Sequence, residues 1–418
     1  MLLEMAWTPP PLAPWVAQLN ALGESGGDGG RALVPLDAGG ALAAAEAATG
    51  LSDFGDDGFR EGLAILCRAL EDEAKLTLLG RLMARAENAR ILATRLRVAA
   101  FAREHPEIAR ERVAAPLFVT GLARTGTSLL LELLWRDAHN RVPLTWEMMD
   151  PVSAARAPAE DPAPAFARAH GEIEVQNHAL PSMKTMHEHG AELPSECIYL
   201  FAHEFATDMF TGFYQVPAYT MWMATRDHAP LYASHCRLLQ LLQWGRPAQR
   251  WVLKAPSHMS HLRELFATYP DARVVITHRD PLQVLGSRAN LMASLRWTRS
   301  EHVDYGALVG AMAFGHAFLA ERVMKERDAG TLPAEQILDV RYCDLVADPV
   351  GTVHRIGEWS SAPLGADAEA SIRRWIDARP KDRHGAHEYA FADTGLDLAA
   401  ERARHAEYQQ RYGVPSEV

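Results

Sequence analysis

Cysteine is scarce in this sequence, with four residues among 418. Cys67, Cys197, Cys236 and Cys343 lie far apart, and no two of them form a C-x-x-C pair. Small secreted domains are dense in cysteine, and zinc sites usually bring their cysteines close together in sequence. We therefore expect reduced thiols and a cytoplasmic protein, with neither a disulfide framework nor a zinc site.

An excess of basic residues is also lacking. Lys and Arg number 42 against 53 Asp and Glu, which gives a formal net charge of −11. General nucleic-acid binding depends on clustered Lys and Arg that meet phosphates, so we expect no nucleic-acid partner. A few local cations can outweigh a distant net charge, and a small anionic ligand therefore stays compatible with this composition.

Long hydrophobic runs are missing as well. The most apolar run of small residues, 306–320, is 15 residues long and contains His316, whereas a membrane-spanning helix needs ~20 residues. The first residues show no basic segment followed by an apolar one, so we expect no secretory signal. Apolar residues make up 48% and charged residues 23%, the balance of a soluble globular protein. The abundance of Ala and Arg suggests a bacterial source.

The pattern along the chain divides it into three regions. Residues 1–112 predict a helical N-terminal region, because leucines such as Leu63, Leu66 and Leu70 recur at helical spacing. Residues 113–395 predict an α/β domain with a helical insertion at about 150–248 that forms a cap over a cleft. Residues 396–418 predict a C-terminal helix or tail.

Four short apolar runs predict the strands of a parallel sheet. They are residues 117–120, 250–253, 273–277 and 336–341, each too short for a helix and separated from the next by helical stretches. Thr127 opens a helix after the first run. Pro281 opens another after the third, in the first turn, where its missing N–H costs nothing. We expect a P-loop-like parallel sheet flanked by helices.

The turn after the first predicted strand has the outline of a phosphate-binding loop. Gly121 and Gly126 are followed by Thr127 and Ser128 at the start of a helix. The glycines let backbone N–H groups approach a ligand at the positive end of that helix. Lysine is missing where an NTPase requires it, since Thr127 follows Gly126, and the cation is Arg124 inside the loop. A tight turn without a ligand is the alternative.

On these residues the sequence resembles the sulfotransferases that use 3′-phosphoadenosine 5′-phosphosulfate (PAPS). Their first motif, P-[KR]-[ST]-G-T-[ST], binds the 5′-phosphosulfate. The corresponding residues here are Ala123, Arg124, Thr125, Gly126, Thr127 and Ser128, with alanine in place of the usual proline. Arginine at position 124 is similar to the tyrosylprotein branch and to many bacterial members. The resemblance covers roughly residues 116–390.

A second motif of this family holds the 3′-phosphate with an arginine at a strand end and a serine eight residues later. Arg279 and Ser287 have this spacing, and they lie at a predicted strand–helix junction downstream of the loop. A guanidinium offers bidentate donors to a phosphate, and a hydroxyl two turns into the helix can reach the same ion. The alternative is Arg279 paired with Asp280 on the surface and Ser287 as a neutral helix residue.

The resemblance also implies reacting groups. Lys254, at the end of a predicted strand, corresponds to the lysine that contacts the sulfuryl or bridging oxygens. Glu147, eight residues after His139, resembles the catalytic glutamate of the tyrosylprotein type and is expected at a strand end opposite the phosphosulfate. His258 is the second candidate for the base, although its spacing from Lys254 differs from that of cytosolic members.

Two further segments match the family less specifically. Tyr342, in a segment similar to R-Y-E-D-L, is expected near the adenine. The basic segment with Arg383, His384 and Gly385 is expected to close over the nucleotide. We expect no metal, because the histidines at 187 and 189 point to different sides of a helix and no third ligand is well spaced.

The function implied by the resemblance is transfer of a sulfuryl group from PAPS to a hydroxyl of a small molecule, glycan or lipid, with release of 3′-phosphoadenosine 5′-phosphate (PAP). One alternative is a P-loop kinase or nucleotide hydrolase, for which Asp339 is the best Walker-B candidate. The other is a non-catalytic protein that binds PAP. The acceptor cannot be read from these motifs, and homo-oligomerisation is left open.

Overall fold

The computed structural model describes residues 7–246, 249–379 and 389–418, and its centre is a parallel sheet. The strand order is β2-β3-β1-β4-β5. The strands are β1 Leu117–Gly121, β2 Asn140–Arg141, β3 Arg250–Lys254, β4 Arg273–His278 and β5 Ile337–Arg341. The four predicted strands are present, which confirms the α/β prediction. The edge strand β2 was not predicted, because two residues carry no readable periodicity.

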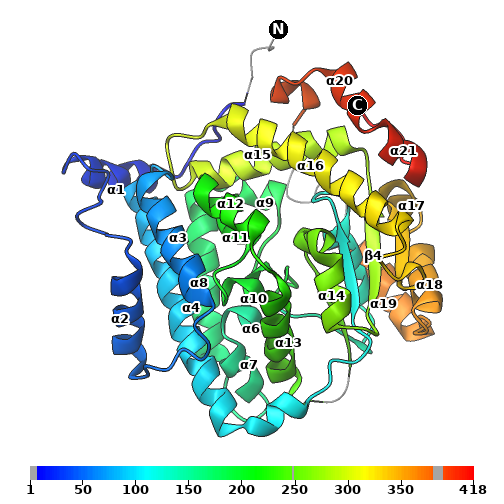
Figure 1. Cartoon of the computed structure of the whole chain (residues 1–418), viewed down its shortest axis with the longest axis horizontal. Helices are drawn as coiled ribbons and strands as arrows, with labels where there is room; N and C mark the ends of the chain where they lie inside the picture. The colour runs from blue at the N-terminus through cyan, green and yellow to red at the C-terminus, as the bar shows by residue number, and fades with distance from the viewer. Residues whose placement is uncertain (1–6, 247–248, 380–388) are drawn as a thin grey trace.

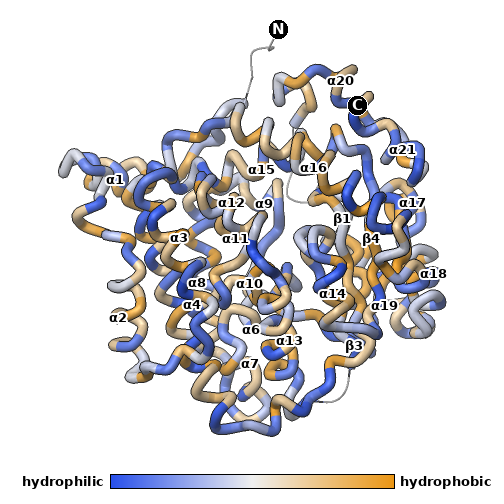
Figure 2. Tube along the Cα trace, in the orientation of Figure 1, coloured by the Kyte–Doolittle hydropathy of each residue, from blue (hydrophilic) through white to orange (hydrophobic). Residues whose placement is uncertain are grey.

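The central strands β1, β3 and β4 are buried on both faces, which explains why their middle residues are mostly apolar. Leu117 and Val119 of β1 pack into one cluster with the helices that follow the strands, whereas Phe118 points into the opposite cluster. All five residues of β1 are buried. Figure 2 shows the hydrophobic residues concentrated in the strands and in the helices beside them.

Helices and short 3-10 segments surround the sheet in sequence order. Those that follow its strands are α5 Thr127–Trp135, η2 Pro256–His261, α14 Leu262–Thr268, α15 Pro281–Trp297, α16 Tyr305–Asp328, η3 Ala334–Gln336, α17 Tyr342–Ala347, α18 Pro349–Trp359 and α19 Ala366–Asp377. The helix starts predicted at Thr127 and Pro281 are confirmed. Asp280 caps α15 by accepting a hydrogen bond from Leu282 N–H.

The N-terminal helices form an outer wall, on the left of Figure 1. They are α1 Pro14–Glu24, α2 Ala38–Thr49, α3 Phe59–Asp72 and α4 Leu78–Glu104, followed by η1 Pro106–Arg110. Buried side chains of α3 and α4 share one hydrophobic cluster with the middle of the chain. A buried ion pair of 2.8 Å between Arg95 of α4 and Glu204 adds a polar connection across this interface.

A helical insertion between β2 and β3 fills the space between this wall and the sheet (Figure 1). Its helices are α6 Thr145–Met149, α7 Pro151–Arg156, α8 Ala163–Ala179, α9 Met183–Met186, α10 Ile198–Ala202, α11 Asp208–Phe213, α12 Pro217–Thr225 and α13 Ala229–Gln243. The C-terminal elements η4 Phe391–Thr394, α20 Leu398–Arg404 and α21 Ala406–Tyr412 lie beyond α15 and α16.

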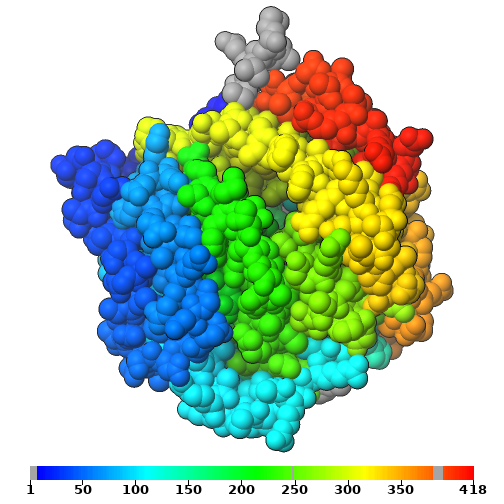
Figure 3. Space-filling view, in the orientation of Figure 1, coloured from blue at the N-terminus to red at the C-terminus, as the bar shows by residue number. Residues whose placement is uncertain are grey.

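Helix α16 is longer than the apolar run seen in the sequence. It has 24 residues, and among the described residues it is the one helix long and apolar enough to cross a membrane. Core helices of soluble proteins meet the same criterion, so this is weak evidence for a span. The helix lies in yellow on the face shown in Figure 3. Its side chains Phe314 and Phe318 are exposed.

Candidate active site

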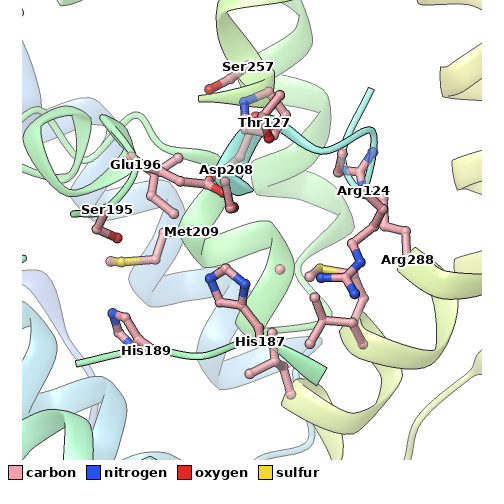
Figure 4. A pocket seen from close by; sticks show the side chains of 18 of the residues that line it. Arg124, Thr127, His187, His189, Ser195, Glu196, Asp208, Met209, Ser257 and Arg288 are labelled. Atoms are coloured by element: carbon pink, nitrogen blue, oxygen red, sulfur yellow. The ribbon is translucent and has the colours of Figure 1, made fainter. Parts of the chain in front are cut away.

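A cavity of about 350 Å³ opens at the carboxyl ends of the central strands, where parallel sheets bind their ligands. One side is formed by the loop after β1 and by Arg279 after β4. The helical insertion contributes His187, His189, Glu196 and other side chains, and α15 closes the remaining side. Figure 4 shows these groups converging from separate segments of the chain.

The loop between β1 and α5 has a backbone shaped for close approach. Arg124 and Gly126 have φ angles of 72° and 90°, in the left-handed region. A Cβ on Gly126 would lie 2.8 Å from Cδ2 of Tyr342, so only glycine fits beside that ring. The Thr125 hydroxyl is buried and bonds Leu122 O at 2.7 Å and the Thr277 hydroxyl at 2.6 Å. Its side chain therefore anchors the loop and does not line the cavity.

Backbone donors at the start of α5 are available to an anion. The first helical bond runs from Leu130 N–H to Gly126 O at 3.0 Å. The N–H groups of Thr127, Ser128 and Leu129 precede it and have no acceptor within the helix. Thr127, Ser128 and Ala123 line the cavity. This arrangement has the geometry of a helix N-terminus that can bind an anion.

The two predicted phosphate-binding segments meet in the structure. Arg124 Nε donates to Ser287 Oγ at 3.0 Å, and Arg279 Nη1 donates to Arg124 O at 3.3 Å. The Arg279 guanidinium lies over the ring of Tyr342, with its central carbon 4.0 Å from the ring centroid. Burial lowers the pKa of Arg124. Four predicted residues from three segments thus form one contact cluster. Arg124, Arg279 and Tyr342 line the cavity, whereas Ser287 is buried and does not.

Arg279 is held by a carboxylate other than that of its neighbour. Its Nε and Nη2 donate to the carboxylate of Glu417, with a shortest distance of 2.7 Å. Asp280 instead caps α15 and pairs with Arg402 at 2.7 Å, so the expected alternative of an Arg279–Asp280 pair is wrong. The contact with Glu417 shows that this guanidinium, in its present position, can donate two hydrogen bonds to one oxyanion.

Lys254 lies behind the loop at the end of β3. Its ammonium group is 2% exposed and donates to Ser128 Oγ at 3.0 Å and to Glu196 Oε1 at 2.7 Å. Both partners line the cavity. Glu196 therefore orients the lysine toward the loop.

Glu147 does not lie at a strand end opposite the loop, the place predicted for it. It belongs to the first turn of α6, and its carboxylate accepts hydrogen bonds from Leu144 N–H at 3.0 Å and from Arg141 at 3.2 Å. Arg246 lies 4.0 Å away. Glu147 is absent from the cavity lining, and these partners give it a helix-capping role.

We expect the Glu147→Gln variant to lose ~1–3 kcal/mol of unfolding free energy, because the buried arginine partner loses its charged acceptor. Urea unfolding measures this loss. Glu321→Gln, which disrupts an exposed ion pair with Lys325, is the control and should leave stability nearly unchanged. Intact stability together with a hundredfold fall in kcat would instead restore Glu147 as a reacting group.

His258, the second candidate base, is also outside the cavity lining. It is fully buried, and its Nδ1 lies 2.8 Å from the Tyr232 hydroxyl. The ring of Phe118 packs edge-on against it at 4.9 Å between centroids. The four-residue step from Lys254 passes through the 3-10 segment η2, which turns this side chain into the core.

Several cavity residues were missed or misjudged from the sequence. Glu196, Asp208 and Arg288 line the cavity, as do His187 and His189. The His187-Glu-His189 pattern is visible in the sequence, but its spacing bears only on metal binding and does not indicate a cavity. The His187 ring projects into the middle of the cavity, between Met209 and Arg288 (Figure 4).

Electrostatics keep the cavity histidine uncharged. Burial, together with the nearby cations Lys254 and Arg124, lowers the pKa of His187 well below its usual 6.5. Burial likewise lowers the pKa of His189 to about 4, and its Nε2 lies 2.8 Å from the Tyr199 hydroxyl. A neutral imidazole has a nitrogen lone pair that can accept a proton, and an anion that neutralises the two cations would strengthen this property.

The remainder of the cavity wall is mostly apolar. It is formed by Met183, Ile198, Met209, Phe213, Leu291, Met292 and Leu295. The cavity thus combines charged side chains with a large apolar lining. The expected nucleotide-closing residues Arg383, His384 and Gly385 lie outside the described residues.

The Walker-B candidate Asp339 has other partners. It accepts hydrogen bonds from Arg327 and lies 2.8 Å from His278 Nε2, and these partners lower its pKa to about 2. It does not line the cavity. The residues needed for phosphoryl transfer by a P-loop kinase are thus not assembled among the described ones.

Comparison with known proteins identifies a family. The sequence model described as "Sulfotransferase family" matches residues 116–365. Omega-hydroxy-beta-dihydromenaquinone-9 sulfotransferase Stf3 of Mycobacterium bovis and of Mycobacterium tuberculosis is 25% identical over 248 residues. That alignment covers 58% of this chain and 61% of each relative, so the chain matches less than two thirds of their length.

Solved structures give a fuller match. Sulfotransferase STF9 from Mycobacterium avium has a TM-score of 0.80 at 28% identity, and the match covers 91% of this chain and 98% of that one. Sulfotransferase STF1 from Mycobacterium tuberculosis has a TM-score of 0.75 at 31% identity, with 88% and 97% covered. The tyrosylprotein branch expected from Arg124 stays a prediction. The resemblance read from the two motifs is confirmed, and the chain belongs to the sulfotransferase family of enzymes.

Proposed function

We propose that this chain transfers a sulfuryl group from PAPS to a hydroxyl of an apolar small molecule, such as a lipid, and releases PAP. The observation that carries the proposal is the contact between the two phosphate-binding segments, through Arg124, Ser287 and Arg279. PAPS has an anionic group at each end of one adenosine, and this cluster offers cationic and hydroxyl donors for both. The scarce, dispersed cysteines fit a cytoplasmic enzyme.

The residues of the chain divide the work of binding. The loop from Ala123 to Ser128 holds the 5′-phosphosulfate with the first N–H groups of α5. Arg279 and Ser287 hold the 3′-phosphate, which takes the place of the Glu417 carboxylate on the guanidinium. The ring of Tyr342, packed against Arg279, borders the adenine side. Lys254 and Arg124 stabilise the charge that develops on the departing phosphate.

His187 acts as the general base in this proposal. It removes the proton from the acceptor hydroxyl while that oxygen bonds to sulfur and the bond from sulfur to the phosphate oxygen breaks. Burial keeps the imidazole neutral before the reaction. The incoming phosphosulfate brings negative charge close to the ring, which raises the affinity of His187 for the proton as the transfer proceeds.

The apolar wall of the cavity supports the choice of acceptor. Methionine and leucine side chains from α9, α11 and α15 line the cavity. Such a wall favours a hydrocarbon chain or ring over a carbohydrate, whose hydroxyls would need many polar partners. The curated relatives are named for a hydroxylated menaquinone, which is an apolar molecule carrying a hydroxyl.

We expect Arg279→Ala to weaken PAP binding ~10- to 150-fold, the effect of losing a charged hydrogen-bonded contact. Isothermal titration calorimetry measures the change. Arg373→Ala removes an exposed arginine on α19 that pairs with Glu369, and it should bind PAP like the wild type. Equal PAP affinity in the Arg279→Ala and wild-type proteins would remove this residue from the site.

A ligand comparison tests the nucleotide itself. PAP should raise the melting temperature more than ADP or AMP at equal concentration, because only PAP has a phosphate for Arg279 and Ser287. A preference for ADP with Mg²⁺ would favour the kinase alternative. Preference for PAP without turnover on a panel of apolar alcohols would favour a binding protein.

A further inference from the structure

A second group of chemically reactive side chains lies in the core, outside the cavity. Cys197 precedes α10, His235 belongs to α13 and His258 belongs to η2. Each offers one ligand atom, and these atoms lie within 4.8 Å of one another. The side chains are 0%, 1% and 0% exposed, respectively.

Both histidines already have a partner on one ring nitrogen. Nδ1 of His235 lies 2.7 Å from the Tyr269 hydroxyl, and Nδ1 of His258 lies 2.8 Å from the Tyr232 hydroxyl. Metal-binding histidines typically use their second nitrogen in this way, which orients the ring and selects the tautomer. Nε2 is then the nitrogen left for a metal.

The two Nε2 atoms have no hydrogen-bond partner among the residues that the structure describes, although both are buried. Leaving a buried polar group unpaired costs ~1–3 kcal/mol, so such atoms are rare in folded proteins. The aromatic surroundings of His258 supply no strong hydrogen-bond acceptor or donor, because the rings of Phe118 and Phe201 pack against it at 4.9 and 5.5 Å between centroids. A bound cation would satisfy both nitrogens together.

We propose that Cys197, His235 and His258 bind one thiophilic cation, Zn²⁺ or Cu⁺, through the thiolate and the two Nε2 atoms. Thiolate and imidazole ligands select these ions. The Cys197 thiol loses its proton to solvent when the ion binds during folding. Small side-chain movements bring the ligand atoms from their present spacing to the ~2.0–2.3 Å metal–ligand distances of such sites.

The site would lie directly behind the reacting groups. Cys197 follows Glu196 in the chain, and its N–H donates to Lys254 O at 2.8 Å. His258 comes four residues after Lys254 and next to the cavity residue Ser257. A metal that joins η2 and α13 to the start of α10 would hold the Lys254–Glu196 pair in place, so its role is to position these side chains.

Elemental analysis of the purified full-length protein tests the proposal without an activity assay. We expect about one equivalent of Zn or Cu per chain, since a structural site fills on folding. X-ray absorption at the edge of the bound element should show one sulfur and two nitrogen ligands. The element found separates the two ions. Cys197→Ser should lose the metal, while Cys67→Ser, which alters a buried cysteine outside the cluster, should keep it.

A refolding experiment covers the case in which Cys197→Ser does not fold. Wild-type protein is unfolded in guanidinium with chelator, then refolded with or without Zn²⁺ or with Cu⁺ under reducing conditions. Metal should raise the melting temperature by ~5 °C or more. Less than ~0.1 equivalent of metal in both native and refolded protein, without a stability change, would overturn the proposal and leave a metal-free core. PAP binding and turnover could persist in that case, so this failure is separable from that of the proposed function.

Discussion

Replacing His187 by glutamine is expected to lower kcat by ~10²- to 10⁴-fold, the usual contribution of a positioned general base. Glutamine keeps the approximate size and polarity of the side chain but cannot accept the proton. PAP affinity should stay within ~3-fold of the wild type, because the ring lies on the acceptor side and the phosphates bind elsewhere. Stopped assays with saturating PAPS measure kcat, and calorimetry measures the affinity.

The pH profile adds a readout specific to proton transfer. Because the pKa of His187 is lowered in the free enzyme, its ring should stay neutral as the pH falls to 6.5, and kcat/KM for PAPS, which reports the free enzyme, should decline only below that value. The acidic decline should disappear in His187→Gln. His178→Gln, on the exposed face of α8, should retain both rate and profile. An unchanged kcat in His187→Gln would mean that another cavity group is the base. The carboxylates of Glu196 and Asp208, which also line the cavity, would then be the candidates.

The second large effect concerns Lys254. We expect Lys254→Met to lower kcat by ~10²- to 10³-fold, the size seen when one donor to developing charge is removed. The ammonium group reaches Ser128 from a buried position, so water cannot replace it as a donor. The acceptor KM should change little, because the lysine is aimed at the phosphosulfate side.

Loss of the lysine also leaves the Glu196 carboxylate without its cation, and a fall in stability could imitate a fall in rate. The double variant Lys254→Met with Glu196→Gln removes both charges and separates the two effects. It should regain stability but not kcat. Lys325→Met, an exposed lysine of α16, is the control for charge alone. Recovery of kcat in the double variant would mean that Lys254 acts only through folding.

Local patterns were sufficient for the central sheet. β1 and the two strands beside it are apolar runs of five or six residues, and each is followed by a turn and a helix. A strand buried on both faces must be largely apolar, and a short apolar run in the sequence therefore predicts such a strand. The edge strand β2 escaped prediction because its two residues pair with β3 through backbone contacts that any sequence could make.

The loop and the strand–helix junction that bring Arg124, Ser287 and Arg279 into contact could be predicted for a related reason. A loop that approaches an anion needs glycine at Gly126, where any Cβ would meet Tyr342, and it needs a helix start directly after it. These requirements fall within a few consecutive residues and therefore appear as a motif. Arg279 and Ser287 likewise lie on one strand–helix junction, so their spacing is set locally.

Glu147 and His258 show that spacing along the chain is not enough to place a side chain in the cavity. Each has a family-like spacing, yet the chain turns through α6 or η2 and directs the side chain to Arg141 or into the core. His187 is the reverse case, because it lines the cavity although it belongs to no family motif in the sequence. Which way a side chain points after an irregular turn depends on packing against distant segments.

Adjacent residues along the chain were thus enough to specify the parallel sheet, the glycine loop and the sulfotransferase family. Three-dimensional packing alone decided which side chains share the cavity, and it alone brought Cys197, His235 and His258 together from separate elements. The physical reason is that backbone preferences and short motifs act over a few residues, whereas a site that joins remote segments exists only after the core has formed around it.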